Sequence, residues 1–180
     1  MLYTRKGDSG TSGLFGTKER FSKDSPIYEA LGTLDELNSL LGVCHAYTLR
    51  EKEGGVMADV IRNVQERLFV VQAELAGADK CITQTQVDEL EKTVDRYEAQ
   101  IENPHAFIIP GATGLSALLD YARAVSRRAE RVVIGAHAPH EASAPTRAYL
   151  NRLSSLLYAL ARHVAGKAGA QEPAPTYKEV

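Results

Sequence analysis

The chain has 180 residues, which is enough for one domain with a sizeable buried core. Hydrophobic residues make up 44% of the sequence and charged residues 24%, as in an ordinary globular protein. The net charge of -2 argues against a general nucleic-acid-binding or membrane-binding surface, and no apolar run approaches the length of a membrane span.

The cysteines and histidines of the sequence argue against a metal site built by the protein. The two cysteines, Cys44 and Cys81, have no neighbouring Cys or His in the spacing of a zinc site. The histidines are scattered, and no pair of them has convincing ligand spacing. Because the N-terminus also lacks an apolar signal segment, we expect a cytoplasmic protein with free thiols and no metal site built by the protein itself.

Residues 1–25 differ in composition from the rest of the chain. Glycines recur at positions 7, 10, 13 and 16 among serines and threonines, and Lys18, Arg20 and Lys23 follow. Glycine lets the backbone approach a ligand closely, and consecutive backbone N–H groups in such turns can hold an anion. The segment is therefore typical of a phosphate-binding loop, although it has no Walker A pattern. The competing interpretation is an unstructured N-terminal arm.

From Pro26 onward the sequence has helical periodicity and no convincing strand signal. Thr83 or Thr85 is expected to cap the third helix, and Pro145 to lie in the first turn of the last. Beside the apolar seam of that last helix, a separate polar stripe is formed by Asn151, Ser155, Tyr158 and Arg162. Apolar residues recur at three- and four-residue steps in five stretches, at about 27–49, 57–75, 83–101, 115–137 and 145–164. The pattern predicts an all-α, five-helix up-and-down bundle of ferritin-like architecture over residues 26–166, followed by a flexible tail over residues 167–180.

The connector between the third and fourth helices contains an unusual apolar run, Phe107-Ile108-Ile109. Such a run can plug the end of the bundle, or it can form an apolar wall for a ligand. The sequence of this connector leaves both interpretations open.

The fourth helix carries a column of arginines. Arg123, Arg127 and Arg131 recur every four residues, Arg128 widens the same side, and Glu130 lies three residues from Arg127. Like charges at this spacing repel, so carboxylates, a bound anion or water must compensate them. The column therefore indicates either an anion-binding face or a solvated basic surface.

Four motifs in chain order extend this interpretation. They are Tyr3-Thr4-Arg5-Lys6-Gly7-Asp8-Ser9-Gly10, Gly32-Thr33-Leu34-Asp35-Glu36-Leu37-Asn38, Ser126-Arg127-Arg128-Ala129-Glu130-Arg131 and Tyr149-Leu150-Asn151-Arg152-Leu153-Ser154. Together they resemble the propanediol-utilisation type of ATP:cob(I)alamin adenosyltransferase, from Tyr3 to about Ala165. The resemblance implies a homotrimer of five-helix bundles with active sites between subunits. It also implies transfer of the 5′-deoxyadenosyl group of ATP to the cobalt of a reduced corrinoid, with release of tripolyphosphate.

The resemblance assigns roles to residues of this sequence. In the N-terminal segment the ATP-binding residues would be Thr4, Arg5, Lys6, Gly7, Ser12, Gly13 and Lys23. On the helices of a neighbouring subunit they would be Arg127, Arg128, Glu130, Arg131 and Asn151, with Arg127 and Asn151 as the catalytic pair. Phe107 matches the residue that lies against the lower face of the corrinoid. Asp35 matches an aspartate that forms an architectural ion pair with the arginine at Arg123.

The chemistry is consistent with these roles. Cob(I)alamin is itself a strong nucleophile, so the protein needs only to align the 5′ carbon of ATP and stabilise the departing tripolyphosphate. Arginine suits this task because its planar fork matches phosphate oxygens. A Mg²⁺ ion held mainly by the phosphates is expected. The expected partners are a corrinoid reductase and an adenosylcobalamin-dependent enzyme.

The sequence departs from the family pattern at three places. Asp120 stands where the family commonly has His, Ser155 stands where it commonly has Asp, and residues 110–114 replace a usual Pro-Gly-Gly. Two other hypotheses remain, namely an ATP-binding regulatory or scaffold bundle without corrinoid turnover, and a helical interaction module with a solvated basic face. ATP binding measured beside ATP-dependent loss of the cob(I)alamin absorbance separates all three.

Overall fold

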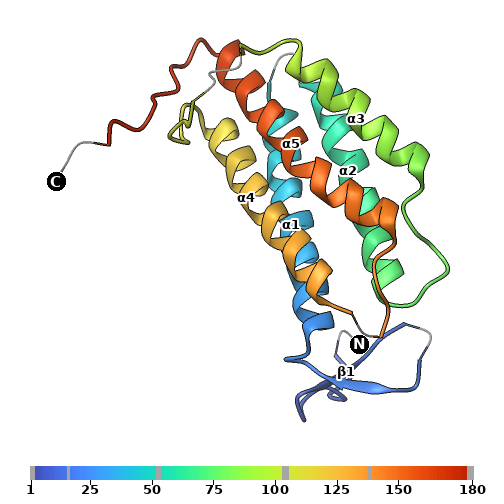
Figure 1. Cartoon of the computed structure of the whole chain (residues 1–180). Coiled ribbons are helices and arrows are strands. Elements are labelled where there is room, and N and C mark those ends of the chain that lie inside the picture. The colour runs from blue at the N-terminus through green and yellow to red at the C-terminus, as the bar shows by residue number, and fades with distance from the viewer. Residues whose placement is uncertain (1–2, 16, 52–53, 103–105, 138, 178–180) are drawn as a thin grey trace.

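Helices account for most of the chain, as the periodicity predicts (Figure 1). The computed structural model describes residues 3–15, 17–51, 54–102, 106–137 and 139–177. Within them the helices are α1 (Pro26–Thr48), α2 (Gly55–Leu75), α3 (Gln84–Glu98), α4 (Gly114–Gly135) and α5 (Ala144–Lys167). The predicted five-helix fold is confirmed, although α3 and α4 end two or three residues earlier than the sequence indicates. None of these helices is both long enough and apolar enough to cross a membrane.

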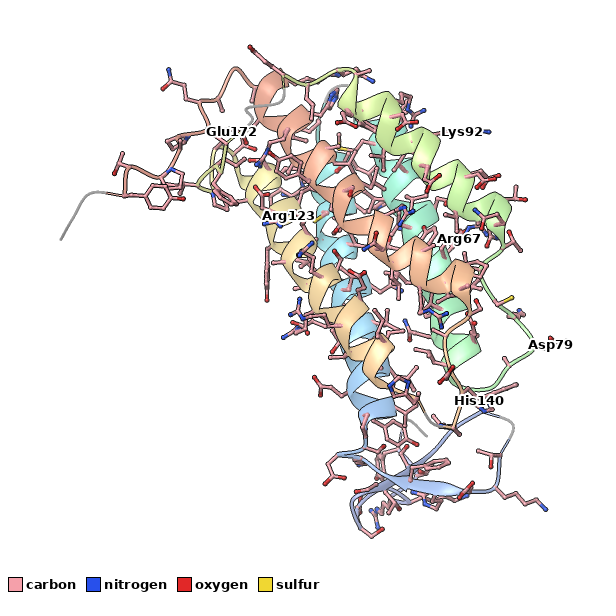
Figure 2. The ribbon with its side chains drawn as sticks, viewed as in Figure 1. Arg67, Asp79, Lys92, Arg123, His140 and Glu172 are labelled. Atoms are coloured by element: carbon pink, nitrogen blue, oxygen red, sulfur yellow. The ribbon has the colours of Figure 1, made fainter. Side chains whose placement is uncertain are left out.

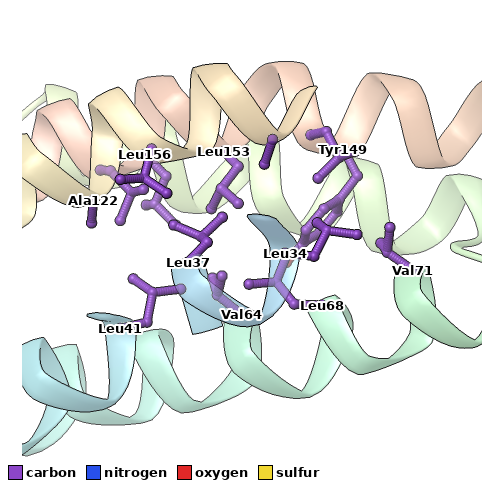
Figure 3. Packing of buried hydrophobic residues seen from close by; sticks show 14 of the residues in the cluster. Leu34, Leu37, Leu41, Val64, Leu68, Val71, Ala122, Tyr149, Leu153 and Leu156 are labelled. Carbon is purple, nitrogen blue, oxygen red and sulfur yellow. The ribbon is translucent and has the colours of Figure 1, made fainter. Parts of the chain in front are cut away.

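Successive helices run in opposite directions along the bundle (Figure 1). Helix α1 packs against α2 and α4, and helix α5 packs against α4 and α3. Their apolar faces meet in one core, part of which is drawn in Figure 3. Its labelled members are Leu34, Leu37, Leu41, Val64, Leu68, Val71, Ala122, Tyr149, Leu153 and Leu156.

Side-chain caps explain where three of the helices begin. Thr83, one of the two predicted candidates, accepts a hydrogen bond from the Gln86 N–H and completes a capping box. Thr113 forms a similar box with Ser116 at the start of α4. Ser143 caps α5, and Pro145 lies in its first turn as predicted. These caps satisfy N–H groups that have no partner within the helix.

A short antiparallel hairpin in the N-terminal segment corrects the prediction that the chain has no strands. Strand β1 (Thr11–Gly13) pairs with β2 (Arg20–Ser22), with Thr11 opposite Ser22. Each strand has three residues, which is too short to establish the two-residue periodicity by which strands are recognised. The hairpin lies at the end of the bundle where α1 begins (Figure 1).

Gly54 lies at the start of α2, against the end of α1. A Cβ atom at Gly54 would lie 1.8 Å from the carbonyl oxygen of Thr48, whereas one at Gly55 would meet nothing within 4 Å. Because the obstacle is backbone, Gly54→Ala is expected to lower the free energy of unfolding by about 1–3 kcal/mol. The control, Gly55→Ala, should change it by less than about 0.5 kcal/mol. Urea denaturation followed by circular dichroism measures both, and equal stabilities would contradict this packing.

Candidate functional site

Arg20 organises the glycine-rich segment. Its Nη2 donates hydrogen bonds to the carbonyl oxygens of Lys6 at 2.7 Å and Thr11 at 2.8 Å, and its Nε donates to the Thr11 hydroxyl at 3.0 Å. One guanidinium thus ties the start of the segment to the hairpin. The described part of the segment is therefore hydrogen-bonded rather than an unstructured arm. Sequence reasoning noted Arg20 as a basic residue but gave it no role.

The two ends of the predicted phosphate-binding segment lie close together. A Cβ atom at Gly7 would lie 3.0 Å from Nζ of Lys23, so the ammonium group sits beside the Gly7 backbone. The Lys23 N–H donates to the Gly10 carbonyl oxygen at 2.9 Å, and Gly10 has a φ of +82°, which favours glycine. This geometry places a cation next to an open stretch of backbone, which is an arrangement suited to an anion.

The remaining predicted residues of this segment also lie in its turns. Arg5 has a φ of +59°, an uncommon conformation for a residue other than glycine. The Thr4 hydroxyl accepts a hydrogen bond from the Lys6 N–H at 3.4 Å. Ser12 and Gly13 belong to strand β1. The strained backbone at Arg5 is typical of a segment that holds a ligand.

The arginines of α4 face solvent. Arg127, Arg128 and Arg131 are exposed, and the Arg131 Nη1 donates to the carbonyl oxygen of Arg127 at 3.0 Å. Arg128 forms an ion pair with Glu36 of α1. Arg128 is therefore the one of these three guanidinium groups for which the described residues show a carboxylate partner. The other two leave a positive surface that can bind an anion.

A chain of polar contacts fixes Glu130 and Asn151 beside these arginines. The Asn151 Nδ2 donates to Glu130 Oε1 at 2.8 Å, which joins α5 to α4. The Asn151 Oδ1 accepts from Arg152 at 2.8 Å, and Arg152 donates to Glu91 of α3 at 3.0 Å. Because both atoms of the Asn151 amide are engaged, its plane is held in one orientation.

The predicted ion pair between Asp35 and Arg123 is not formed within this chain. Asp35 is exposed on α1, whereas Arg123 Nε lies 3.7 Å from Asp120 Oδ1, one helical turn away. Asp120 in turn accepts a hydrogen bond from Arg162 of α5 at 2.5 Å. The local partner on the same helix is within easier reach than one on α1. A pair between Asp35 and Arg123 of different subunits stays a prediction.

The structure corrects the expectation that Arg162 lies on a polar face of the last helix. The sequence places it on a polar stripe with Asn151, but it is only 3% exposed. An arginine is rarely buried without a charged partner, and Asp120, which is 4% exposed, provides one. The departure at Asp120 therefore builds a buried ion pair between α4 and α5.

Phe107 lies far from the arginine column along the same chain. It is 78% exposed in the loop that precedes α4, and Ile109 in this loop is 49% exposed. These side chains do not plug the bundle, so they are available to an apolar partner. From Gly114 to Arg127 the helix rises about 20 Å. The hairpin lies at the opposite end of the bundle (Figure 1).

Two of the three predicted parts of the site, the N-terminal segment and the loop that carries Phe107, lie at opposite ends of the bundle in one chain (Figure 1). Among the hydrogen bonds and ion pairs of the described residues, none joins the N-terminal segment to the α4 arginines.

Other ionisable side chains are poor candidates for catalysis. Burial raises the pKa of Cys44 to about 11, so its thiol is neutral near pH 7 and is a weak nucleophile. Burial also lowers the pKa of His163, which packs edge-to-face on Tyr97. In the described ranges no group of three or more His, Cys, Asp or Glu residues could hold a metal ion.

Known proteins resemble this chain over most of its length. A family model described as cobalamin adenosyltransferase matches residues 2–164. A corrinoid adenosyltransferase of Citrobacter freundii is 40% identical over 168 residues, which cover 89% of this chain and 93% of that protein. The corrinoid adenosyltransferase PduO of Salmonella typhimurium is 38% identical over 89% of this chain, but the match covers 48% of its own length. The chain thus spans about half of that relative.

Solved structures show the same architecture. A variant PduO-type ATP:corrinoid adenosyltransferase from Lactobacillus reuteri, complexed with cobalamin and ATP, superposes with a TM-score of 0.89. It is 26% identical, and the match covers 99% of this chain and 98% of that one. A further variant complexed with ATP gives a TM-score of 0.87 at 27% identity, covering 97% of this chain and 99% of the other.

Proposed function

Because the chain belongs to the cobalamin adenosyltransferase family, we propose that it transfers the 5′-deoxyadenosyl group of ATP to the cobalt of cob(I)alamin or a related reduced corrinoid. The products are adenosylcobalamin and tripolyphosphate. The single observation that carries the proposal is the exposed arginine face of α4, beside which Glu130 and Asn151 are fixed by their hydrogen bond.

ATP binds between the α4 arginines of one subunit and the N-terminal segment of another. Arg127 and Arg131 contact the triphosphate directly, and Arg128 joins them from its ion pair with Glu36. Lys23 and the backbone around Gly7 surround the same phosphates, together with Thr4, Arg5, Lys6, Ser12 and Gly13. A Mg²⁺ ion would be held mainly by the ATP phosphates rather than by protein residues, and it would help to neutralise their charge.

The protein contributes alignment and charge stabilisation, since the reduced cobalt supplies the nucleophile. Arg127 stabilises the negative charge that grows on the tripolyphosphate as the bond to the 5′ carbon breaks. Asn151, whose amide plane is fixed, orients the nucleoside relative to Arg127. The Asn151 amide is preorganised by these hydrogen bonds, so its orientation needs little change during the reaction.

The corrinoid lies against the exposed Phe107 side chain, which covers its lower face. An apolar contact there displaces water and the lower axial ligand. Loss of an electron-rich ligand makes Co(II) easier to reduce, because such a ligand favours the higher oxidation state. A separate corrinoid reductase supplies the electron, and an adenosylcobalamin-dependent enzyme consumes the product.

The active unit is a homotrimer in the cytoplasm with its sites between subunits. The N-terminal hairpin and the loop that precedes α4 lie at opposite ends of the bundle in one chain (Figure 1), which supports this assembly. In it, residues 1–25 act as an ATP-wrapping segment on the bundle of residues 26–166, and residues 167–180 form the tail.

Asp35→Ala tests the assembly. If Asp35 pairs with Arg123 of a neighbouring subunit, the variant should weaken association at least tenfold, since an arginine at the interface loses its partner. Light scattering coupled to size-exclusion chromatography measures the trimer fraction against concentration. Asp59→Ala removes an exposed aspartate from α2 and should leave that fraction unchanged. An unchanged trimer in Asp35→Ala would remove the architectural role of this pair.

The reaction is tested by mixing the chain with chemically reduced cob(I)alamin and Mg-ATP under anaerobic conditions. Loss of the cob(I)alamin absorbance that requires both ATP and the protein supports the proposal. Binding of ATP without this loss would favour the regulatory or scaffold hypothesis. Absence of ATP binding would favour the interaction module.

A further inference from the structure

A buried ion cluster joins α4 and α5 to the segment that follows α5. Arg162 Nη2 donates to Asp120 Oδ2 at 2.5 Å, and Arg162 Nε lies 3.0 Å from Glu172 Oε1. The ring of Tyr158 lies 5.0 Å from the Arg162 guanidinium carbon and covers the cation. We name Asp120, Arg162 and Glu172 the tail anchor.

The tail anchor needs the carboxylate from the tail. Arg162 and Arg123 bring two positive charges to the cluster, and Asp120 and Glu172 bring two negative charges. The side chains of Arg162 and Asp120 are only 2% and 4% exposed, so water screens them poorly. Removing Glu172 would leave two cations, the buried Arg162 and the partly exposed Arg123, sharing the single carboxylate of Asp120. Electrostatics therefore favours a docked tail.

Pro173, the residue after Glu172, connects the docked tail to the loop that carries Phe107. The Ile109 N–H donates a hydrogen bond to the carbonyl oxygen of Pro173 at 2.8 Å. Glu172 and Arg123 lie on the same side of the bundle, away from Lys92 of α3 (Figure 2). The Glu172 side chain is only 18% exposed, and burial raises the pKa of its carboxyl while the Arg162 guanidinium opposes that rise.

We infer that Arg162 and Glu172 are positioning residues: they fix the C-terminal segment, whose Pro173 carbonyl then holds the loop at Ile109 so that Phe107 is preorganised for the corrinoid. This inference rests on the proposed function. It concerns the corrinoid side of the reaction alone, because the ATP-binding groups lie on other parts of the chain. The loop is thus held by a charge pair more than fifty residues away in sequence.

Glu172→Gln tests the inference in the full-length chain, because it removes the charge and keeps the side-chain shape. The control is Glu141→Gln, in which the exposed partner of His137 loses its charge. Amide hydrogen exchange of peptides covering residues 106–112 should become about tenfold faster in Glu172→Gln and stay unchanged in Glu141→Gln. Peptides from α1 and α2 should exchange at the wild-type rate in both variants.

Kinetics provides the second readout. If only about one-tenth of the molecules keep the loop in the conformation that binds the corrinoid, the apparent KM for cob(I)alamin rises about tenfold. The KM for ATP should stay within about twofold of wild type. A chain that ends at Ala170 lacks both Glu172 and Pro173 and should show an effect at least as large.

Three outcomes would overturn the inference. The first is unchanged exchange of the loop in Glu172→Gln. The second is faster exchange of the loop with no change in the KM for cob(I)alamin. The third is equal loss for both substrates with faster exchange in all helices, which is general destabilisation. If the wild-type chain does not adenosylate cob(I)alamin, the proposed function fails, whereas loop exchange still decides whether the tail anchor holds the loop.

Discussion

Arg127→Ala is expected to lower kcat by roughly 10³-fold, because single groups that stabilise developing negative charge contribute this much to catalysis. Arg127 is exposed on α4, and its carbonyl oxygen, not its guanidinium, accepts the hydrogen bond from Arg131. Truncation at Cβ therefore removes the phosphate contact and leaves the helix intact. Steady-state kinetics with cob(I)alamin and Mg-ATP measures the loss.

Two variants make the result for Arg127 specific. Arg127→Lys keeps one positive charge but loses the planar fork, so it should fall between wild type and Arg127→Ala. Arg62→Ala removes an exposed arginine of α2 and should retain wild-type kcat. Thermal unfolding should be the same for all three variants within a few degrees. A wild-type kcat in Arg127→Ala, or dissociation of its trimer, would contradict the catalytic role.

A chain that begins at Asp24 is expected to bind ATP at least about 100-fold more weakly than the full chain. Charge-assisted hydrogen bonds contribute about 1.5–3 kcal/mol each, and loss of two of them corresponds to a factor of about 100 or more. The truncation keeps Ser25, which precedes α1, and the whole helical bundle. Isothermal titration calorimetry with Mg-ATP measures affinity, and circular dichroism checks that helix content is retained.

Two point variants distinguish whether ATP binding depends on the folded shape of the N-terminal segment or only on its positive charge. Arg20→Ala removes the three hydrogen bonds that tie Lys6 and Thr11 together and should weaken ATP binding by about tenfold. Lys18→Ala removes an equal charge two residues away and should have less than a threefold effect. Equal affinity in the truncated and full chains would refute the wrapping role of the segment.

The sequence alone was sufficient to predict the structural features that depend on the spacing of neighbouring residues along the chain. Long helices repeat the same apolar spacing many times, so five helices and most of their limits follow from the pattern. The cap at Thr83 and the first-turn position of Pro145 follow from the chemistry of the first helical turn. The arginine column follows from the four-residue spacing, since that spacing alone sets which side chains share a face.

The tertiary structure alone decided the contacts between distant residues. It paired Arg162 of α5 with Asp120 of α4, and it thereby buried Arg162 on a helix face that looked polar. It also gave Arg20 a structural role and formed a hairpin too short to have a periodic pattern. Periodicity specifies which face of a helix is buried, but not which neighbour covers it. Charged partners many residues apart are selected only when packing removes them from water, where their mutual attraction becomes strong.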